Sequence, residues 1–313
     1  MFSLRSSAFF LLCTGYFLLG APLIGEGQTG AAVPAAGVPF GMARQRAAIL
    51  RDIRYDLAFH LPADKENPVH GEETLVFTLG KDPRAPLPLD FKAPTGAVLS
   101  LRVNGAAAPV RLEKEHLLLP PAFLHRGPDT VTVSFIAGNA ALNRNSEFLY
   151  TLLVPDRART LFPCFDQPDL KAIYRLTLTS PAGWKVISNA PLLDSTDWGD
   201  SCRFRFGPSD RLSTYLFSFA AGRFSATTRM VDGRPMRFLY RETDSVRLRL
   251  SLDSVFRIEG QALRFLQQYT ASSYPFQKFD FVAIPDFQFG GMEHAGAIQY
   301  KASSLFLDSG ATR

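Results

Sequence analysis

Two shortages in the sequence exclude whole classes of protein. Three cysteines in 313 residues are too few for a disulfide scaffold. Five histidines, no two of them four residues apart, provide no metal-binding pair on one helix face. An excess of positive charge is also missing: the net charge is +5, with lysine and arginine scattered among acids. We therefore expect no nucleic-acid partner.

Long apolar runs are absent except near the N-terminus. Arg5 precedes an apolar segment, residues 8–19, and small residues follow as far as Ala36. A basic residue, a short apolar core and a small-residue exit are typical of a secretory signal peptide. A membrane anchor is the alternative, but a bilayer span needs about 20 residues. We predict a signal peptide over residues 1–21, a linker over 22–44, and export to the periplasm, cell envelope or medium.

The cysteines leave one question open. If Cys13 is removed with the signal peptide, Cys164 and Cys202 remain. An oxidising compartment permits a disulfide between them, and their spacing does not decide whether they meet. Two small buried residues are the favoured interpretation.

Alternating apolar residues begin at Ile53 and predict a sheet with one buried face. The first strand covers residues 53–61. Similar runs cover residues 74–79, 98–103, 117–119, 131–135, 174–178, 184–187, 203–206, 215–219 and 236–240. Asn104-Gly105 lies between apolar runs, which is a strong hairpin signal. We predict a mainly β fold, with an antiparallel β-sandwich or saddle domain over residues 45–240.

The pattern changes to mixed α and β after residue 240. Apolar residues recur every three or four positions over residues 244–269, which predicts one amphipathic helix with its apolar stripe in a core. A short strand, residues 279–284, follows. We place a second domain over residues 241–313.

The stretch PDFQFGGMEHAGAIQY, residues 285–300, follows that strand. Its centre is Gly290, Gly291, Met292, Glu293 and His294. Paired glycines mark a bulge or a place where another backbone comes close. A peptide with a free α-ammonium would offer a backbone to the glycines and a cation to the carboxylate. The structural alternative is a glycine turn with a solvent-facing Glu-His pair.

Two motifs resemble peptidase family M1, the aminopeptidase N-like zinc aminopeptidases. GGMEH followed by AGAIQY resembles the G-[AG]-M-E-N motif, and FPCFDQPDLKA, residues 162–172, resembles FPCFDEP-x-x-K-A. The similarity runs from about residue 51 to residue 313. It implies an aminopeptidase N-like β domain, the start of a thermolysin-like catalytic domain, Zn²⁺ as cofactor and peptides with a free N-terminus as substrates.

The resemblance also assigns substrate-binding roles. Gly290, Gly291 and Met292 would lie along the substrate backbone, and Glu293 would bind its α-amine. His294 stands where the family most often has Asn. It would either hydrogen-bond through a ring nitrogen or add a titrating charge near Glu293.

The family's zinc motif, HExxH, is missing, so we expect no catalytic residue and no metal ligand in this chain. The sequence ends where the family's sequence runs toward HExxH. We interpret the chain as an N-terminal fragment that is inactive alone and has the remainder of the catalytic domain as its partner. The alternative is a non-catalytic β-rich binding protein derived from the same family.

Two further positions bear on the site. Many family members carry a Gln ten residues before the FPCFD phenylalanine, where this chain has Leu152. The first-residue pocket would then be more apolar, or another group would accept the amine's hydrogen bond. For Asp166, Asp169 and Lys171, capping and ion pairing at a turn are the favoured roles.

Overall fold

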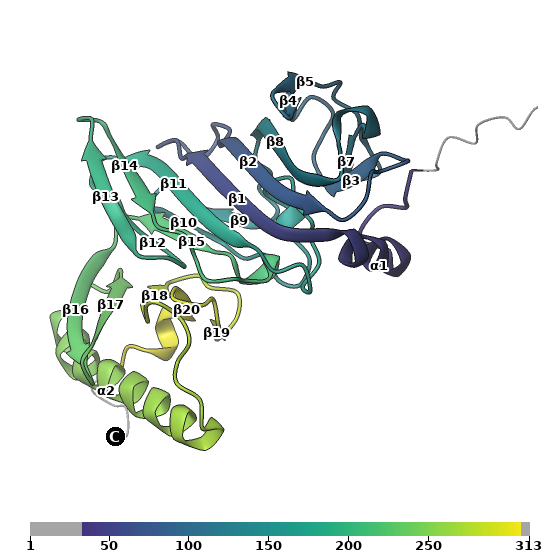
Figure 1. Cartoon of the computed structure of the whole chain (residues 1–313). Helices are drawn as coiled ribbons and strands as arrows, with labels where there is room; N and C mark the ends of the chain where they lie inside the picture. The colour runs from purple at the N-terminus through teal and green to yellow at the C-terminus, as the bar shows by residue number, and fades with distance from the viewer. Residues whose placement is uncertain (1–32, 308–313) are drawn as a thin grey trace, which may run out of the picture. The chain divides into compact units, whose positions relative to one another are not determined.

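The computed structural model describes residues 33–307, and the predicted signal peptide lies outside this range. Strands dominate the described residues (Figure 1). They form sheets of eight, five, four and three strands, so the predicted mainly β fold class is confirmed.

The largest sheet contains six of the ten strands that the sequence pattern predicted. In spatial order it consists of β13 (Leu192–Asp197), β14 (Ser201–Phe206), β11 (Ile173–Pro181), β1 (Leu50–His60), β2 (His70–Leu79), β8 (Gly127–Ile136), β4 (Val98–Val103) and β5 (Ala106–Ala107). Neighbours are antiparallel except β1 and β11, which are parallel. One face is buried, because Tyr55, Leu57 and Phe59 on β1 are at most 2% exposed.

Two smaller sheets complete the first core. One consists of β12 (Lys185–Ser188), β15 (Phe219–Gly222), β10 (Phe148–Thr151) and β9 (Leu142–Arg144). The other consists of β3 (Leu87–Asp90), β7 (His116–Leu119) and β6 (Leu112–Glu113). The rings of Phe59 on β1 and Phe219 on β15 lie 5.3 Å apart, and those of Phe91 and Phe135 lie 5.6 Å apart. These contacts join the sheets across a shared aromatic core.

The predicted hairpin is present. Asn104 and Gly105 connect β4 to β5 with φ values of 51° and 81°. Positive φ at both central residues is the geometry of a type I′ turn, which matches the twist of the flanking strands.

A five-stranded sheet organises the C-terminal part. It consists of β16 (Ser225–Val231), β17 (Arg234–Tyr240), β18 (Phe281–Ile284), β20 (Ile298–Lys301) and β19 (Gly291–Met292). The strand at residues 236–240, which we had placed in the first domain, therefore shares a sheet with β18 to β20. Sheet membership changes near residue 224, earlier than the boundary at 240 that the composition suggested.

The long helix is α2 (Ser245–Thr270), as predicted. The Asp244 side chain accepts hydrogen bonds from the backbone N–H groups of Val246 and Arg247, which is a standard N-cap. Only part of its apolar stripe is in a core: Val255 is buried, whereas Ile258 and Phe265 are 55% and 61% exposed. The prediction that the whole stripe is buried was wrong for the described residues.

Other differences concern shorter segments. Helix α1 (Phe40–Ile49) begins inside the predicted linker. The predicted strand at residues 215–219 is a 3-10 turn, η3, followed by β15. Turn η3 covers Thr214–Leu216. The other 3-10 turns are η1 (Pro121–Phe123), η2 (Ala158–Thr160) and η4 (Ala302–Ser304).

Cys164 and Cys202 are both free, so they do not pair in this structure. Cys164 is buried, as expected, and Cys202 is partly exposed. None of the helices within residues 33–307 combines the length and apolar character that a membrane crossing requires.

Candidate functional site

The GGMEH motif lies at the edge of the five-stranded sheet. Strand β19 is the last in the order β16-β17-β18-β20-β19 and pairs with β20 alone, with Gly291 opposite Tyr300 and Met292 opposite Gln299. An edge strand has one row of unpaired backbone N–H and C=O groups, which can accept an extended peptide. The structure therefore provides the open backbone edge that the paired glycines suggested.

The two glycines have different reasons to lack a side chain. A Cβ added at Gly290 would meet no atom within 4 Å, so this backbone is open to an approaching molecule. A Cβ added at Gly291 would come within 3.0 Å of the Tyr300 ring, which closes that side. Gly291 thus packs closely against the Tyr300 ring of β20, and Gly290 leaves the approach clear.

Glu293 is exposed next to this edge. Its carboxylate makes no ion pair and no side-chain hydrogen bond with any residue of the described range, 33–307. The hydrogen-bonding capacity of an ionised carboxylate is then directed at solvent or at a bound cation. This arrangement suits the binding of an ammonium group.

Met292 connects the motif to the N-terminal domain. It is 7% exposed and belongs to a hydrophobic cluster with Tyr150, Leu152 and Phe287. Leu152 is fully buried in this cluster, so the side chain at the expected Gln position is part of the packing beside Met292. The ring centroids of Tyr150 and Phe287 are 5.4 Å apart. Burial raises the pKa of Tyr150 to about 12, so its hydroxyl stays neutral.

His294 does not share the exposed edge with Glu293. Its ring is buried, and Nδ1 donates a hydrogen bond to the Leu216 carbonyl oxygen at 3.3 Å. Burial lowers the pKa of His294 to about 4, so the ring is neutral near pH 7. A titrating charge near Glu293 is therefore excluded at neutral pH, and the hydrogen bond goes to protein backbone.

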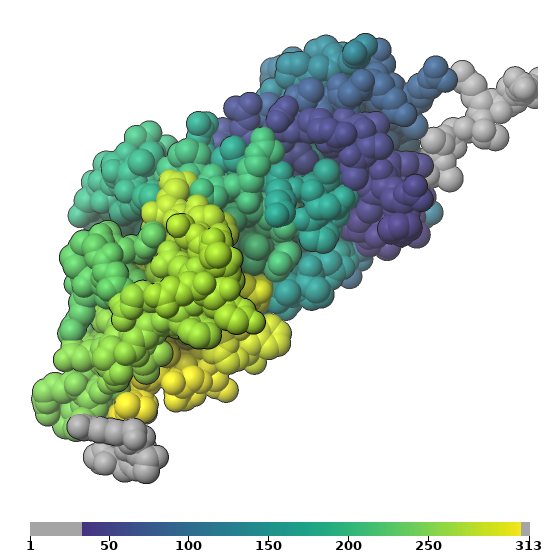
Figure 2. Space-filling view, turned by 60° about the horizontal axis from the view of Figure 1, so that its bottom comes forward, coloured from purple at the N-terminus to yellow at the C-terminus, as the bar shows by residue number. Residues whose placement is uncertain are grey.

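Asn189 is a site residue that the sequence did not reveal. Its Nδ2 donates to the Leu216 carbonyl and to the Ala295 carbonyl, each at 2.9 Å, and its Oδ1 accepts from the Ser218 N–H at 2.8 Å. Ala295 directly follows His294. Figure 2 shows yellow-green residues of the C-terminal part lying against teal and green residues of the preceding sheets. Asn189 and His294 both stabilise this junction between the GGMEH segment and the preceding sheets.

The FPCFDQPDLK segment is largely buried and internally hydrogen-bonded. Asp166 accepts hydrogen bonds from the Arg159 N–H at 3.0 Å and from Thr214 Oγ1 at 3.1 Å, and burial raises its pKa to about 6. Its own N–H donates to Asp90 at 2.9 Å, and Asp90 also binds Arg46. Asp166 therefore has the structural role that the sequence favoured.

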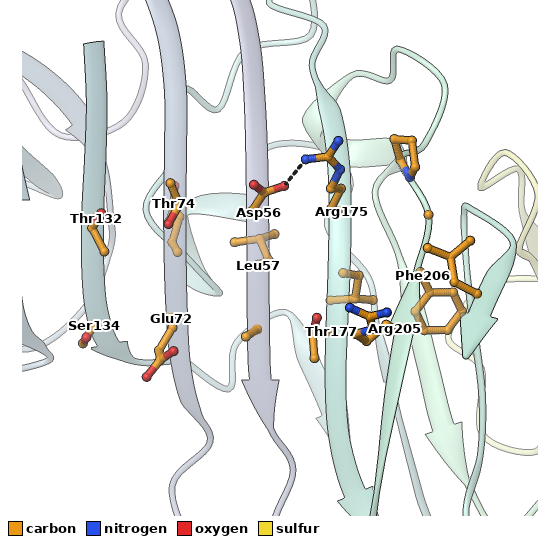
Figure 3. Close-up of a pocket in the computed structure, with 16 residues that line it drawn as sticks. Asp56, Leu57, Glu72, Thr74, Thr132, Ser134, Arg175, Thr177, Arg205 and Phe206 are labelled. Carbon is orange, nitrogen blue, oxygen red and sulfur yellow. Dashed lines mark ion pairs between the residues drawn. The ribbon is translucent and has the colours of Figure 1, made fainter. Parts of the chain in front are cut away.

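Two surface grooves are also present, and neither is lined by Gly290, Gly291 or Glu293. Figure 3 shows the larger, of about 580 Å³, where side chains of neighbouring strands of the eight-stranded sheet project from one face. Three of its charged side chains are in ion pairs: Asp56 lies 3.7 Å from Arg175, and Arg205 lies 2.6 Å from Asp194. The other, of about 350 Å³, runs along α2 past Leu266, Tyr274 and Tyr300.

The sheet arrangement and the GGMEH edge agree with the comparisons with known proteins. Residues 140–216 match the peptidase M1 N-terminal domain, and residues 255–313 match the peptidase family M1 domain. Over these residues the chain matches peptidase family M1, as the two motifs indicated.

Individual relatives support this assignment. The chain is 28% identical over 277 residues to aminopeptidase N of Streptomyces lividans, a match that covers 84% of this chain and 32% of that protein. It is 33% identical over 156 residues to human glutamyl aminopeptidase, covering 49% of this chain and 16% of that protein. It is also 30% identical over 164 residues to probable aminopeptidase 1 of Sulfurisphaera tokodaii, covering 52% and 20%. The chain thus spans about a third or less of these relatives.

M1 aminopeptidases are in general zinc enzymes, but the described residues do not fit a zinc site. Within residues 33–307, no group of three or more His, Cys, Asp or Glu side chains is arranged to hold a metal ion. His116 contacts Asp90 and the Ala35 carbonyl, and His125 contacts Asp129. No reaction step through a metal can be derived from these residues.

Proposed function

We propose that this chain provides the amine-binding part of the substrate site of an exported M1-type zinc aminopeptidase, which removes N-terminal residues from peptides. The observation that carries the proposal is the position of Glu293, an exposed carboxylate with no partner among the described residues, beside an open strand edge. A free N-terminus offers both groups that this edge lacks, a strand and a cation.

In this proposal the peptide backbone lies along Gly290 and β19, and its α-ammonium meets Glu293. Holding the ammonium in a fixed position leaves one residue between it and the scissile bond. The buried cluster around Met292 and Leu152 packs beneath this edge and supports it. The zinc ligands would be supplied by sequence that this chain does not contain. The 313 residues alone are then expected to bind a free N-terminus without hydrolysing the peptide.

Calorimetric titration tests the binding step. A short peptide beginning with leucine is titrated in its free and N-acetylated forms against the wild-type chain, Glu293→Gln and Glu72→Gln. Glu72 is a matched control, because it is an exposed carboxylate on the eight-stranded sheet. We expect acetylation and Glu293→Gln each to weaken binding about tenfold or more, and Glu72→Gln to leave it unchanged. Equal binding of the acetylated peptide would refute the assignment of Glu293.

Export is part of the proposal, and the predicted signal peptide at residues 1–21 supports it. Fractionation of the native cells, with N-terminal sequencing of the recovered protein, tests it. A mature protein that begins near residue 22 outside the cytoplasm is expected. A cytoplasmic protein that retains the apolar segment would contradict export.

A non-catalytic binding protein of the same family is the second candidate. The exposed apolar residues of α2, including Ile258, Phe265 and Tyr269, favour it, since such a surface suits a partner. The gene beyond the Arg313 codon separates the two candidates. An open frame with HExxH and a downstream Glu supports the peptidase, and a stop codon supports the binding protein.

A further inference from the structure

One short segment, residues 213–218, lies between the two motifs that the sequence singled out. It contains η3 and leads into β15. The FPCFDQPDLK segment precedes it by about 40 residues and the GGMEH motif follows it by about 70. It makes hydrogen bonds to both.

On one side the segment contacts the FPCFDQPDLK motif. Thr214 Oγ1 donates to Asp166 Oδ1 at 3.1 Å, and Ser213 Oγ donates to the Pro168 carbonyl at 2.7 Å. The backbone of Leu212 exchanges hydrogen bonds of 2.9 Å with that of Ala172 just before it. The beginning of the segment is therefore fixed to the motif by side chains and backbone.

On the other side the segment contacts the GGMEH loop. The Leu216 carbonyl accepts from His294 Nδ1 at 3.3 Å and from Asn189 Nδ2 at 2.9 Å. Asn189 also donates to the Ala295 carbonyl. One backbone oxygen thus holds the residue that follows Glu293 and, through Asn189, the next residue as well.

Glu293 has no side-chain anchor of its own among the described residues, so its position depends on its neighbours. Met292 before it is paired with β20 and buried, and His294 after it is bound to Leu216. Movement of η3 would displace the second of these anchors. Buried hydrogen-bond networks of this kind specify one arrangement because an unpaired member is costly.

We propose that residues 213–218 act as a strut that transmits the position of the FPCFDQPDLK motif to Glu293, with His294 as its positioning residue. The effect on binding rests on the proposed role of Glu293 in holding the amine. FPCFDQPDLK then contributes to the site without touching a substrate, and the histidine in place of the family's usual asparagine serves the protein's own backbone.

Methionine methyl labelling tests the strut directly. The chain has five methionines, and Met292 is adjacent to Glu293. Thr214→Val removes the hydroxyl that binds Asp166, and His294→Leu removes the donor to Leu216. We expect both variants to shift the ¹³C-methyl signal of Met292 while that of Met230, which is 66% exposed on β16, stays in place.

Conservative variants and a matched control complete the test. Thr214→Ser and His294→Asn each keep a donor and are expected to restore the Met292 signal. Thr227→Val makes the same change on β16, where the hydroxyl contacts Tyr240, and should leave the Met292 signal unchanged. Unchanged Met292 signals in both Thr214→Val and His294→Leu would overturn the strut.

Peptide binding then separates the two proposals. Thr214→Val and His294→Leu should weaken binding of the free peptide about tenfold, the factor that one buried hydrogen bond supplies. If the wild-type chain binds no peptide, the proposed role of Glu293 fails. The Met292 signal still decides whether the strut exists.

Discussion

His294 Nδ1 donates a hydrogen bond to the carbonyl oxygen of Leu216, a residue 78 positions earlier in the chain. The acceptor belongs to a turn next to the four-stranded sheet, and the donor directly follows the exposed Glu293. Since a carbonyl can only accept, the bond requires a proton on Nδ1, so Nε2 carries none in the neutral ring. The GGMEH motif and the N-terminal domain are therefore joined by a buried histidine, and protonation of its Nε2, which has no hydrogen-bond partner within residues 33–307, would place a charge in the interior.

The stability of the chain should depend on pH through His294. Its pKa is lowered to about 4 by burial, against about 6.5 in an unfolded chain. The stabilisation is present above pH 6.5 and is lost as pH falls toward 4, because the unfolded state takes up the proton first. Acidification from pH 7 to 4 should cost the wild type about 3 kcal/mol more than His294→Asn.

Urea denaturation at several pH values measures this difference. His60→Asn is the control, because His60 is exposed at the end of β1. It should lose stability in parallel with the wild type. A parallel loss in His294→Asn as well would show that His294 does not titrate as the structure predicts.

Glu73 should destabilise the fold as pH rises. It is 1% exposed on β2, neither carboxylate oxygen has a hydrogen-bond partner within residues 33–307, and burial raises its pKa well above the usual value. The folded state retains the proton above pH 4.5, so ionisation penalises it increasingly as pH rises. The stability gained by Glu73→Gln should grow by up to about 1.4 kcal/mol per pH unit.

Thermal unfolding between pH 5 and 8 checks this prediction. Glu72→Gln alters the adjacent carboxylate, which is exposed, and should leave the melting temperature unchanged at each pH. A constant difference between Glu73→Gln and the wild type across this range would mean that Glu73 is not protonated in the fold.

Asp90→Asn should be among the most damaging polar substitutions. Asp90 is fully buried and accepts two hydrogen bonds from Arg46, each of 2.7 Å, and one from His116. Although burial alone would raise it, the His116 hydrogen bond and the Arg46 charge hold the pKa of Asp90 below its usual value. Removing the charge leaves buried Arg46 uncompensated, which typically costs about 3–5 kcal/mol.

The exposed pair of Asp194 and Arg205 is the matched control, because its shortest contact, 2.6 Å, is comparable. Asp194→Asn should have no measurable effect on chemical denaturation, since solvent already screens this pair. Similar losses in the two variants would refute the distinction between them.

Gly296→Ala should disrupt the junction, and Gly290→Ala should not. Gly296 has φ +72°, and an added Cβ would come within 2.4 Å of the Asn189 carbonyl oxygen. Both the conformation and the contact disfavour alanine, so we expect a loss of about 2 kcal/mol or more in unfolding free energy. Gly290 has open space, and its alanine variant should unfold within about 0.5 kcal/mol of the wild type. Comparable stability of the two variants would contradict this account.

Much of the fold follows from local patterns in the sequence. The alternation from Ile53 and the Asn104-Gly105 turn predicted strands and a hairpin that the structure contains. The apolar period over residues 244–269 predicted the limits of α2 to within a residue. These features depend on neighbours in the chain, so a single sequence displays them.

The errors arise where distant residues decide the structure. The apolar run at residues 215–219 resembles a strand, but its backbone is held as η3 by partners about 30 and 80 residues away. The stripe on α2 has the correct period, yet its packing in the cluster with residues of β16, β17 and β18 determines which part is buried. The candidate site shows the same division. The sequence proposes Glu293 and its glycines as site residues, whereas the contacts of Asn189 and the direction of His294 depend on the assembled fold.

The short length of β19 has a further consequence. An exposed sheet edge ordinarily invites a second molecule to extend the sheet, and long flat edges lead to aggregation. Strand β19 consists of Gly291 and Met292 only, so only two residues are available for pairing, too few to form a stable ladder with a strand of another copy. So short an edge favours pairing with the end of a chain, and it adds little stabilisation to pairing with the middle of one.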